Sequence, residues 1–323
     1  MELNPLMLWP PEIEAMRAEA RAAVADTIEV VQAMIGQTDP LPDDPLERAQ
    51  VARRSFDRMY VVSPDAVDRE VAGVRCRTFV PGGQARAVYL HFHGGGMILG
   101  APEMNDVANA ELCTRFGVAV VSVDYRLAPE HPYPAGVDDC TAVARWLLSH
   151  ADDEFGSDRL VLGGESAGGY LAAAVALRIR DELGEIARVD GVNLVFGVYD
   201  WGRSPSQRGV RVHEGPDVLD PEGLSFFTEA YLPDRTDDER RLPSVSPAFA
   251  DLSGLPPALM SVGTTDHLLD DTLMLATRWA TAGNRVDLFV APDLPHGFMA
   301  YPCGITERWR STTDAWFAEV LAR

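Results

Sequence analysis

The sequence predicts an α/β fold in which a mostly parallel β-sheet is covered by helices on both faces. Strand-like and helix-like segments alternate along most of the 323 residues, a rhythm that favours parallel strands joined by right-handed crossovers. The strand-like segment Val118–Val123 is almost entirely apolar, as expected for a parallel strand buried on both faces. A chain of this length fits a single α/β domain, although a simple length rule would suggest two.

The N-terminal part precedes this rhythm. Residues Pro11–Met34 are rich in Ala and Glu with apolar residues at helical spacing, and the Pro-rich segment Asp39–Pro45 ends the predicted helix. Two strands are expected next, over Met59–Val62 and Val71–Val80.

The alternation then runs to the C-terminus. The expected strands are Ala87–Phe92, Val118–Val123, Leu160–Leu162, Val192–Phe196, Ala258–Val262 and Val286–Ala291. The expected helices are Glu103–Phe116, Val137–Ser149, Ala167–Leu183, Asp271–Ala282 and Thr306–Leu321. Residues 200–250 interrupt the pattern, being rich in Pro, Gly, Asp and Arg with one helical piece over Glu222–Tyr231. We expect this insertion and the N-terminal helix to form a lid over the strand ends.

Composition and charge exclude several kinds of protein. Hydrophobic residues make up 46% and charged residues 24%, which is typical of a globular protein rather than a disordered or fibrous one. The net charge of −21 repels nucleic acid and anionic lipid. All 28 basic residues are arginine, so chemistries that need a lysine, such as a Schiff base or a P-loop, are absent.

The cysteines and apolar runs indicate a cytoplasmic protein without a membrane span. The four cysteines show no C-x-x-C spacing and read as reduced thiols. The longest apolar runs, such as Ala172–Leu177, are far shorter than a membrane span. The first ten residues carry no Lys or Arg, so no signal peptide is predicted.

A serine lies in the motif that nucleophilic hydrolases need. Residues 164–168 (GESAG) match G-x-S-x-G and lie between a short apolar strand and a long helix. In that setting Ser166 occupies a tight turn, and flanking glycines avoid clashes with the neighbouring strand and helix. The helix N-terminus also favours developing negative charge. We therefore expect Ser166 to be a nucleophile.

A glycine run supplies candidate donors for an oxyanion. Residues 93–96 (HGGG) follow a predicted strand, and consecutive glycines leave backbone N–H groups bare for a close approach to a ligand. His91 and His93 have the spacing of a metal-binding pair, but no third ligand is evident, so no metal site is predicted. His93 is interpreted as a hydrogen-bond donor that orients the loop.

A serine nucleophile needs a base, and the base needs a carboxylate. His296 lies in the segment just after the last predicted strand, at its C-terminal end, where α/β sites are built. Four other histidines fit worse: His131, His150, His213 and His267. Asp266 follows the strand Ala258–Val262 and is the preferred acid; Asp200 is the rival. Asp270 and Asp271 are expected to cap the next helix.

Taken together, these motifs resemble the bacterial hormone-sensitive-lipase-type carboxylesterases of the α/β-hydrolase superfamily. The matching pieces occur in the family's order: HGGG at 93–96, DYRLAPE at 124–130, YPA at 133–135, GESAGG at 164–169, Asp266, and HGF at 296–298. The resemblance implies an α/β-hydrolase fold with residues 1–45 as the N-terminal part of a helical cap. Residues 46–323 would form the catalytic domain, with a cap insertion at about 200–250.

The resemblance also implies roles for individual residues. Ser166 corresponds to the nucleophile, His296 to the base and Asp266 to the acid, while the N–H groups of Gly95, Gly96 and Ala167 correspond to the oxyanion donors. The chain departs from many members at two positions. Glu165 is expected to make a local polar contact, and Met97 to give a softer pocket wall. An ion pair of Arg126 with Glu130 or Asp124 is expected to brace the loop around the DYRLAPE motif.

The function expected from this resemblance is hydrolysis of short-chain acyl esters through an acyl-enzyme, with no metal or organic cofactor. The same triad could instead cleave an amide, a lactone or a carbonate, and the residues leave these open. A non-catalytic small-ligand-binding protein on this fold is a further alternative. The expected partner is a small ester substrate, with no nucleic acid. Analogy with the family points to a homodimer.

Overall fold

The computed structural model describes residues 8–35, 42–58, 60–210 and 219–323. Within these residues lies one eight-stranded sheet with the order β1-β2-β4-β3-β5-β6-β7-β8. The strands are β1 (Val67–Val71), β2 (Val74–Phe79), β3 (Val88–Phe92), β4 (Ala119–Val123), β5 (Leu160–Glu165), β6 (Val189–Val195), β7 (Ala258–Gly263) and β8 (Val286–Ala291). All pairs from β4 to β8 are parallel, so the predicted mostly parallel α/β sheet is confirmed.

The first two strands differ from the prediction. Of the segment predicted at 71–80, Val71 ends β1 and residues 74–79 form β2, the second arm of an antiparallel hairpin that turns at Ala72 and Gly73, both with positive φ. β1 is exposed along four of its five residues, so its sequence lacks the apolar alternation that reveals a strand. The strand expected at 59–62 is wrong, because residues 60–62 lie outside any strand; Met59 lies outside the described residues.

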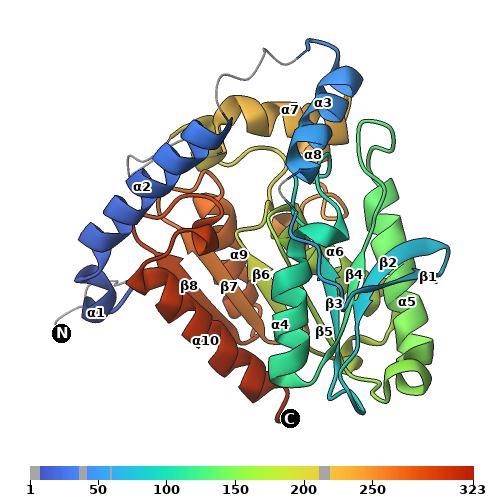
Figure 1. The fold of residues 1–323 in the computed structure, drawn as a ribbon. Coiled ribbons are helices and arrows are strands. Elements are labelled where there is room, and N and C mark those ends of the chain that lie inside the picture. Colours follow the sequence, from blue (N-terminus) through green and yellow to red (C-terminus); the bar gives the residue numbers. More distant parts are fainter. Residues whose placement is uncertain (1–7, 36–41, 59, 211–218) are drawn as a thin grey trace.

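Helices cover both faces of the sheet (Figure 1). The α-helices are α1 (Pro11–Glu14), α2 (Arg17–Ile35), α3 (Pro45–Asp57), α4 (Asp106–Phe116), α5 (Ala135–Phe155), α6 (Ala167–Arg178), α7 (Pro221–Tyr231), α8 (Asp237–Arg240), α9 (Leu269–Thr281) and α10 (Gly304–Val320). The short turns are η1 (Pro102–Asn105), η2 (Ile179–Leu183), η3 (Ile186–Arg188), η4 (Ser206–Arg208), η5 (Pro247–Phe249) and η6 (Phe298–Ala300). Helices α4 and α10 pack on one face, and α5, α6 and α9 pack on the other.

The central strand β3 shows how the two layers form. Leu90 and Phe92 are fully buried in the cluster that includes residues of α5 and α6. Tyr89 points to the other face, where its ring meets Phe317 of α10 edge-on at 5.5 Å. Successive side chains of a strand point to opposite faces, so a strand buried on both sides is apolar at nearly every position.

Helix α3 was not predicted. Its start carries a readable signal, since Asp44 accepts a hydrogen bond from the N–H of Glu47 at 2.9 Å and Pro45 occupies the first helical position. Both are typical of a helix N-terminus. The helix expected over Ala167–Leu183 is α6, whose last turn continues as the π-helical turn η2.

The N-terminal helices and the insertion surround one end of the sheet (Figure 1). Helix α2 is tied to the C-terminal part of the chain, where Arg17 binds Asp293 at 2.8 Å and Glu19 accepts from the N–H of Gly304 at 3.1 Å. Helix α7 lies over the loop after β3, because a Cβ at Gly96 would come within 2.7 Å of the Phe227 ring. Elements distant in sequence therefore converge near the loops that follow the strands.

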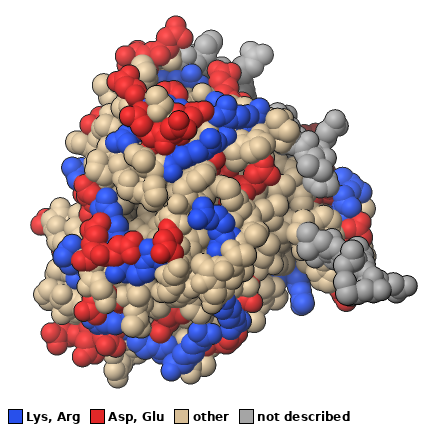
Figure 2. All heavy atoms as spheres, turned by 180° about the vertical axis from the view of Figure 1, so that it is seen from behind, with Lys and Arg blue, Asp and Glu red and all other residues tan. Residues whose placement is uncertain are grey.

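The surface is rich in ion pairs. On the face turned away from the view of Figure 1, arginines and carboxylates are interspersed rather than separated by sign (Figure 2). Of the helices in the described part of the chain, none is long and apolar enough to cross a membrane.

Candidate active site

Four loops that follow parallel strands meet at one edge of the sheet. They are the glycine loop after β3 (residues 94–99), the turn after β5 that carries Ser166, the loop after β7 that carries Asp266 and the loop after β8 that carries His296. Carboxyl ends of parallel strands share an edge. The sheet topology therefore brings together residues that are far apart in sequence.

Ser166 lies on a strained turn between β5 and α6. Its backbone angles are φ 56° and ψ −119°, a combination that L-residues adopt rarely and at a cost of about 1–3 kcal/mol. A hydrogen bond from its N–H to the carbonyl oxygen of Val195 on β6, at 2.9 Å, helps to hold the turn. A Cβ at Gly168 would overlap the carbonyl oxygen of Phe92, so α6 can approach β3 only with glycine there.

Ser166, His296 and Asp266 form one hydrogen-bonded chain. His296 Nε2 lies 3.1 Å from Ser166 Oγ, and His296 Nδ1 lies 2.9 Å from Asp266 Oδ2. The Asp266 side chain is completely buried, whereas 15% of the His296 side chain is exposed. With a proton on Nδ1, the imidazole donates to the carboxylate and leaves Nε2 free to accept the serine proton.

Two neighbours fix this chain in place. The N–H of Leu268 donates to Asp266 Oδ1 at 2.8 Å, the carboxylate oxygen that His296 does not contact. The ring of Phe196 meets the imidazole edge-on, with the ring centres 4.6 Å apart. Packing and hydrogen bonds together limit rotation of the carboxylate and the imidazole.

The other candidate carboxylates lie in different contacts. Asp200, the rival acid, accepts hydrogen bonds from Arg241 at 3.2 Å and from the N–H of Gly202 at 2.8 Å. Asp270 and Asp271 do not cap α9, whose N-cap is Leu268 without a side-chain cap. They instead receive hydrogen bonds from the loop after β6, because the first turn of α9 faces that loop.

The glycine loop presents backbone donors beside the serine. Gly95, Gly96 and Met97 all have positive φ, at 118°, 62° and 64°. Among the described residues, the N–H groups of Gly95, Gly96 and Ala167 have no hydrogen-bond acceptor. An ideal Cβ at Gly94 would lie 3.5 Å from the Cβ of Ser166, so the loop and the serine are neighbours.

Met97 does not form the soft pocket wall that we expected. Its side chain is fully buried, and its methyl group lies against Gly136 of α5, where an ideal Cβ would be 2.9 Å away. The positive φ of Met97 turns its side chain into the core. The sequence could not reveal this, because the turn geometry decides the direction of the side chain.

His93 holds the start of the glycine loop, as expected for a loop-orienting donor. Its Nδ1 lies 2.7 Å from the carbonyl oxygen of Gly94, and its ring stacks on Tyr125 with centres 4.2 Å apart. The Tyr125 hydroxyl donates to the carbonyl oxygen of His93 at 2.7 Å. Complete burial lowers the pKa of His93 to about 3, so the ring is neutral and donates from Nδ1.

Glu165 makes the local polar contact expected of it. Its Oε2 accepts from Asn105 at 3.2 Å and lies 3.2 Å from Nε2 of His91. His91 in turn has Nδ1 2.8 Å from the Ser122 hydroxyl. Hydrogen bonds explain His91 without a metal. Within the part of the chain that the structure describes, no three His, Cys, Asp or Glu side chains are arranged to hold a metal ion.

The expected partners of Arg126 are wrong. Arg126 binds Asp139 on α5, with Nη2 to Oδ1 at 2.7 Å, and Asp124 pairs with Arg75 at 2.9 Å. Glu130 pairs with Arg53 of α3, which sequence reasoning missed. These partners lie on other elements, so spacing within the motif could not identify them.

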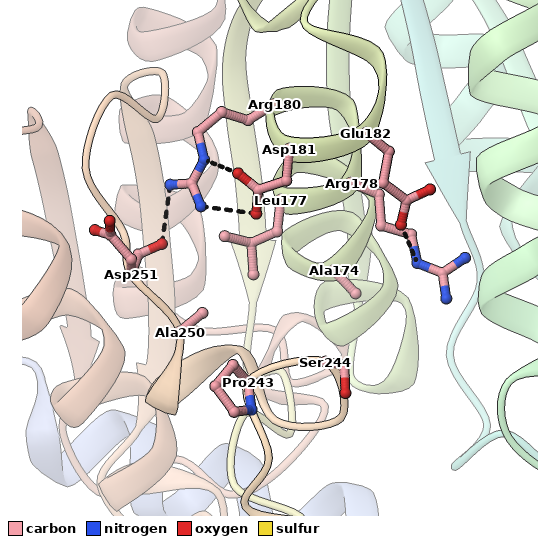
Figure 3. Close-up of a pocket in the computed structure, with 10 residues that line it drawn as sticks. All are labelled: Ala174, Leu177, Arg178, Arg180, Asp181, Glu182, Pro243, Ser244, Ala250 and Asp251. Atoms are coloured by element: carbon pink, nitrogen blue, oxygen red, sulfur yellow. Dashed lines mark hydrogen bonds and ion pairs between the residues drawn. The ribbon is translucent and has the colours of Figure 1, made fainter.

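A separate hollow lies near the far end of α6 (Figure 3). It has a volume of about 460 Å³ and is lined by residues of α6, η2 and the segment 243–251. Charged side chains that line the hollow pair with one another: Arg180 binds Asp181 at 2.6 Å and also donates to the carbonyl oxygen of Asp251 at 2.9 Å. At 1.5 Å per residue, the helix separates Arg178 from the serine turn by roughly 18 Å. The hollow is distinct from the serine site.

Comparison with known proteins agrees with the fold and the motifs. A family model described as alpha/beta hydrolase fold matches residues 89–300. Carboxylic ester hydrolase LipN of Mycobacterium tuberculosis is 36% identical over 73% of this chain, and the match spans 64% of LipN, less than two thirds of its length. Carboxylesterase NlhH of the same species is 36% identical over 66% of this chain and 67% of its own.

A solved structure extends the match to nearly the whole chain. The crystal structure of a hormone-sensitive lipase from a metagenome library superposes with a TM-score of 0.72 and 30% identity, covering 92% of this chain and 96% of that one. The family match, the sequence relatives and the structural neighbour all indicate the same family. The chain belongs to the α/β-hydrolase family and, within it, to the hormone-sensitive-lipase-type carboxylesterases.

Proposed function

We propose that this protein is a serine carboxylesterase that hydrolyses short-chain acyl esters. The observation that carries the proposal is the hydrogen-bonded chain from Ser166 through His296 to the buried Asp266. Membership in a carboxylesterase family supports the choice of an ester over other acyl compounds. Short acyl chains are what the family resemblance implies, and the Phe227 ring, which lies 2.7 Å from an ideal Cβ at Gly96 in the glycine loop, is consistent with a confined site.

The proposed reaction has two halves. As Ser166 Oγ attacks the ester carbonyl, His296 Nε2 accepts its proton and then protonates the departing alcohol. Asp266 stabilises the imidazolium and keeps the proton on Nδ1. The resulting acyl-enzyme is attacked by water, which gives a proton to His296. Collapse of the second tetrahedral intermediate returns that proton to Ser166 and releases the acid.

The oxyanion of each tetrahedral intermediate would bind the N–H groups of Gly95, Gly96 and Ala167. These groups have no other acceptor within the described residues, and the N-terminus of α6 adds a favourable dipole. One such donor contributes on the order of 3 kcal/mol to the barrier reduction. This chemistry uses side chains and backbone of the chain itself.

Two further parts of the proposal concern organisation. We propose that residues 1–45 and the insertion at about 200–250 act as a cap over the site, which the position of α7 over Gly96 supports. Residues 1–7, 36–41 and 211–218 of that cap lie outside the described part. The four buried free cysteines suit a reducing, cytoplasmic compartment. A homodimer stays a prediction of the family resemblance, to be tested by light scattering.

The test is hydrolysis of p-nitrophenyl esters from acetyl to decanoyl. Wild type should prefer short chains, and Ser166→Ala should lower kcat about 10⁴-fold or more. Ser149→Ala, a change at an exposed serine of α5, should behave as wild type. A folded Ser166→Ala that keeps wild-type turnover would refute the assignment. Activity only on an aryl amide, lactone or carbonate would keep the nucleophile and change the substrate class.

A further inference from the structure

The glycine loop has an unusual backbone that needs support from its surroundings. Three consecutive residues, Gly95, Gly96 and Met97, have positive φ. Inside the loop, the carbonyl oxygen of Gly95 accepts from the N–H groups of Ile98 and Leu99 at 3.0 and 2.8 Å. Backbone in such conformations persists only where neighbouring contacts fix it. The question is which residues do so.

Arg53 of α3 supplies the contacts at the end of the loop. Its Nε donates to the carbonyl oxygen of Ile98 at 2.7 Å, and its Nη2 donates to the carbonyl oxygen of Ala128 at 2.6 Å. Both Nη atoms also donate to Glu130, at 2.7 and 2.8 Å. Only 22% of the Arg53 side chain is exposed. One planar guanidinium thus joins four acceptor atoms, which belong to three residues from two separate loops.

The geometry of these acceptors requires arginine. The N–H of Ala128 also donates to the carbonyl oxygen of Met97 at 2.8 Å. The two carbonyls that follow Gly96 are therefore both held, one by Ala128 and one by Arg53. A guanidinium offers five donors in a fixed plane, whereas a lysine ammonium is a compact point charge that cannot span the same acceptors.

Helix α3 reaches the loop by a second route. Arg48, five residues before Arg53, lies over the Phe226 ring of α7 at 4.6 Å. The adjacent Phe227 packs on Gly96. Helix α3 therefore contacts the far end of the glycine loop directly and the middle of the loop, at Gly96, through α7.

We infer that Arg53 is a positioning residue for the oxyanion donors, an inference that rests on the proposed function. By fixing the carbonyl of Ile98, it keeps the strained turn in the conformation that aims the N–H groups of Gly95 and Gly96 at the reacting carbonyl. Oxyanion stabilisation depends on donors that are held before the charge develops. Loosening them weakens transition-state binding more than substrate binding, so kcat should change rather than KM.

The experiment compares Arg53→Met, Arg53→Lys, Glu130→Gln and Arg54→Met on the best p-nitrophenyl ester. Arg53→Met should lower kcat about 10- to 100-fold and change KM less than about threefold. Arg53→Lys should recover only a small part of the lost kcat. Glu130→Gln should lower kcat less than Arg53→Met does, because the hydrogen bonds from Arg53 to Ile98 and Ala128 remain. Arg54 is exposed on the same helix, and its replacement should leave kcat within about twofold.

A transition-state analogue separates positioning from general damage. An alkyl trifluoromethyl ketone, to which Ser166 adds to form a tetrahedral oxyanion, should bind Arg53→Met more weakly by the factor lost in kcat/KM. Circular dichroism and thermal melting report the fold, and Arg53→Lys and Glu130→Gln carry the test if Arg53→Met does not fold. The inference would be overturned if folded Arg53 variants kept the wild-type kcat and analogue affinity, or if only their KM changed. Absence of hydrolysis in wild type would instead refute the proposed function.

Discussion

The Ser–His–Asp chain and the glycine loop meet at the same edge of the sheet but are held in different ways. Ser166, Asp266 and His296 each follow a strand of the sheet within a few residues, and their contacts are mostly with one another or with adjacent strands. The glycine loop also follows a strand, but α3 holds its far end at Ile98 and α7 packs on it at Gly96, and both helices lie outside the sheet. The side chains of the proposed triad thus depend on the sheet, and the proposed oxyanion donors depend also on surrounding helices.

The largest effect is expected from a change in the Ser–His–Asp chain, which the sheet holds. Asp266→Asn should lower kcat by up to about 10⁴-fold, because an amide favours the wrong imidazole tautomer and cannot stabilise the cation. The measurement is kcat and KM on the preferred ester.

Asp200→Asn is the matched control for this change. Asp200 is buried like Asp266 but pairs with Arg241, so its replacement should change kcat less than about tenfold. Equal losses in the two variants would show that Asp266 has no special role.

An intermediate effect is expected from a change in the glycine loop, which α3 and α7 hold. Gly96→Ala would place a Cβ 2.7 Å from the Phe227 ring, so the loop or α7 must shift. We expect kcat to fall roughly 10- to 100-fold. Adding Phe227→Ala should restore part of the loss, which steady-state kinetics of the double variant measures.

Gly283→Ala controls for backbone strain alone. Gly283 has a similarly positive φ of 88°, and no atom lies within 4 Å of its ideal Cβ. This change should lower the free energy of unfolding by about 1 kcal/mol and leave kcat unchanged. If both glycine variants lose the same activity, contact with Phe227 is not the cause.

The smallest effect concerns the start of the glycine loop, where His93 is buried and neutral. Its pKa is lowered to about 3 in the folded protein, against about 6.5 in an unfolded chain. Between these values only the unfolded chain binds the proton, so the stabilisation is complete above pH 6.5 and declines as the pH falls toward 3. From pH 7 to 5 the loss is about 2 kcal/mol.

His93→Asn isolates this contribution. Asparagine keeps a donor for the Gly94 carbonyl but does not titrate in this range. Denaturant unfolding of wild type and variant at pH 7 and pH 5 should show a smaller loss in the variant. An identical pH dependence in the two proteins would mean that His93 takes up no proton on unfolding.

Sequence reasoning named candidate residues in both parts, but it missed the contacts that hold the glycine loop, for a physical reason. The candidates Ser166, Asp266 and His296 were chosen because each follows a predicted strand, and parallel topology then brings such positions together. The contacts of Arg53 with Ile98 and Ala128 join elements with no local pattern in common. Such contacts depend on how helices pack, which spacing along the chain does not encode.

The same contrast between buried and exposed elements explains where the fold prediction was wrong. The buried strands β3 and β4 are each apolar at all positions but one, so their sequences identify them. The exposed strand β1 carries Asp, Arg and Glu and gives no such signal. The only sequence signals for helix α3 are Asp44 and Pro45 at its start. The turn that buries Met97 has no recognisable signal in the sequence.

The most direct test of the central claim is covalent labelling of Ser166. Wild-type protein treated with a fluorophosphonate, an acyl-transfer mimic that reacts with activated serines, would be examined by intact mass and peptide mapping. We predict one adduct, located on the peptide that contains Ser166 and absent from Ser166→Ala. No adduct on folded wild type, or an adduct of equal extent in Ser166→Ala, would contradict the claim that His296 and Asp266 activate this serine.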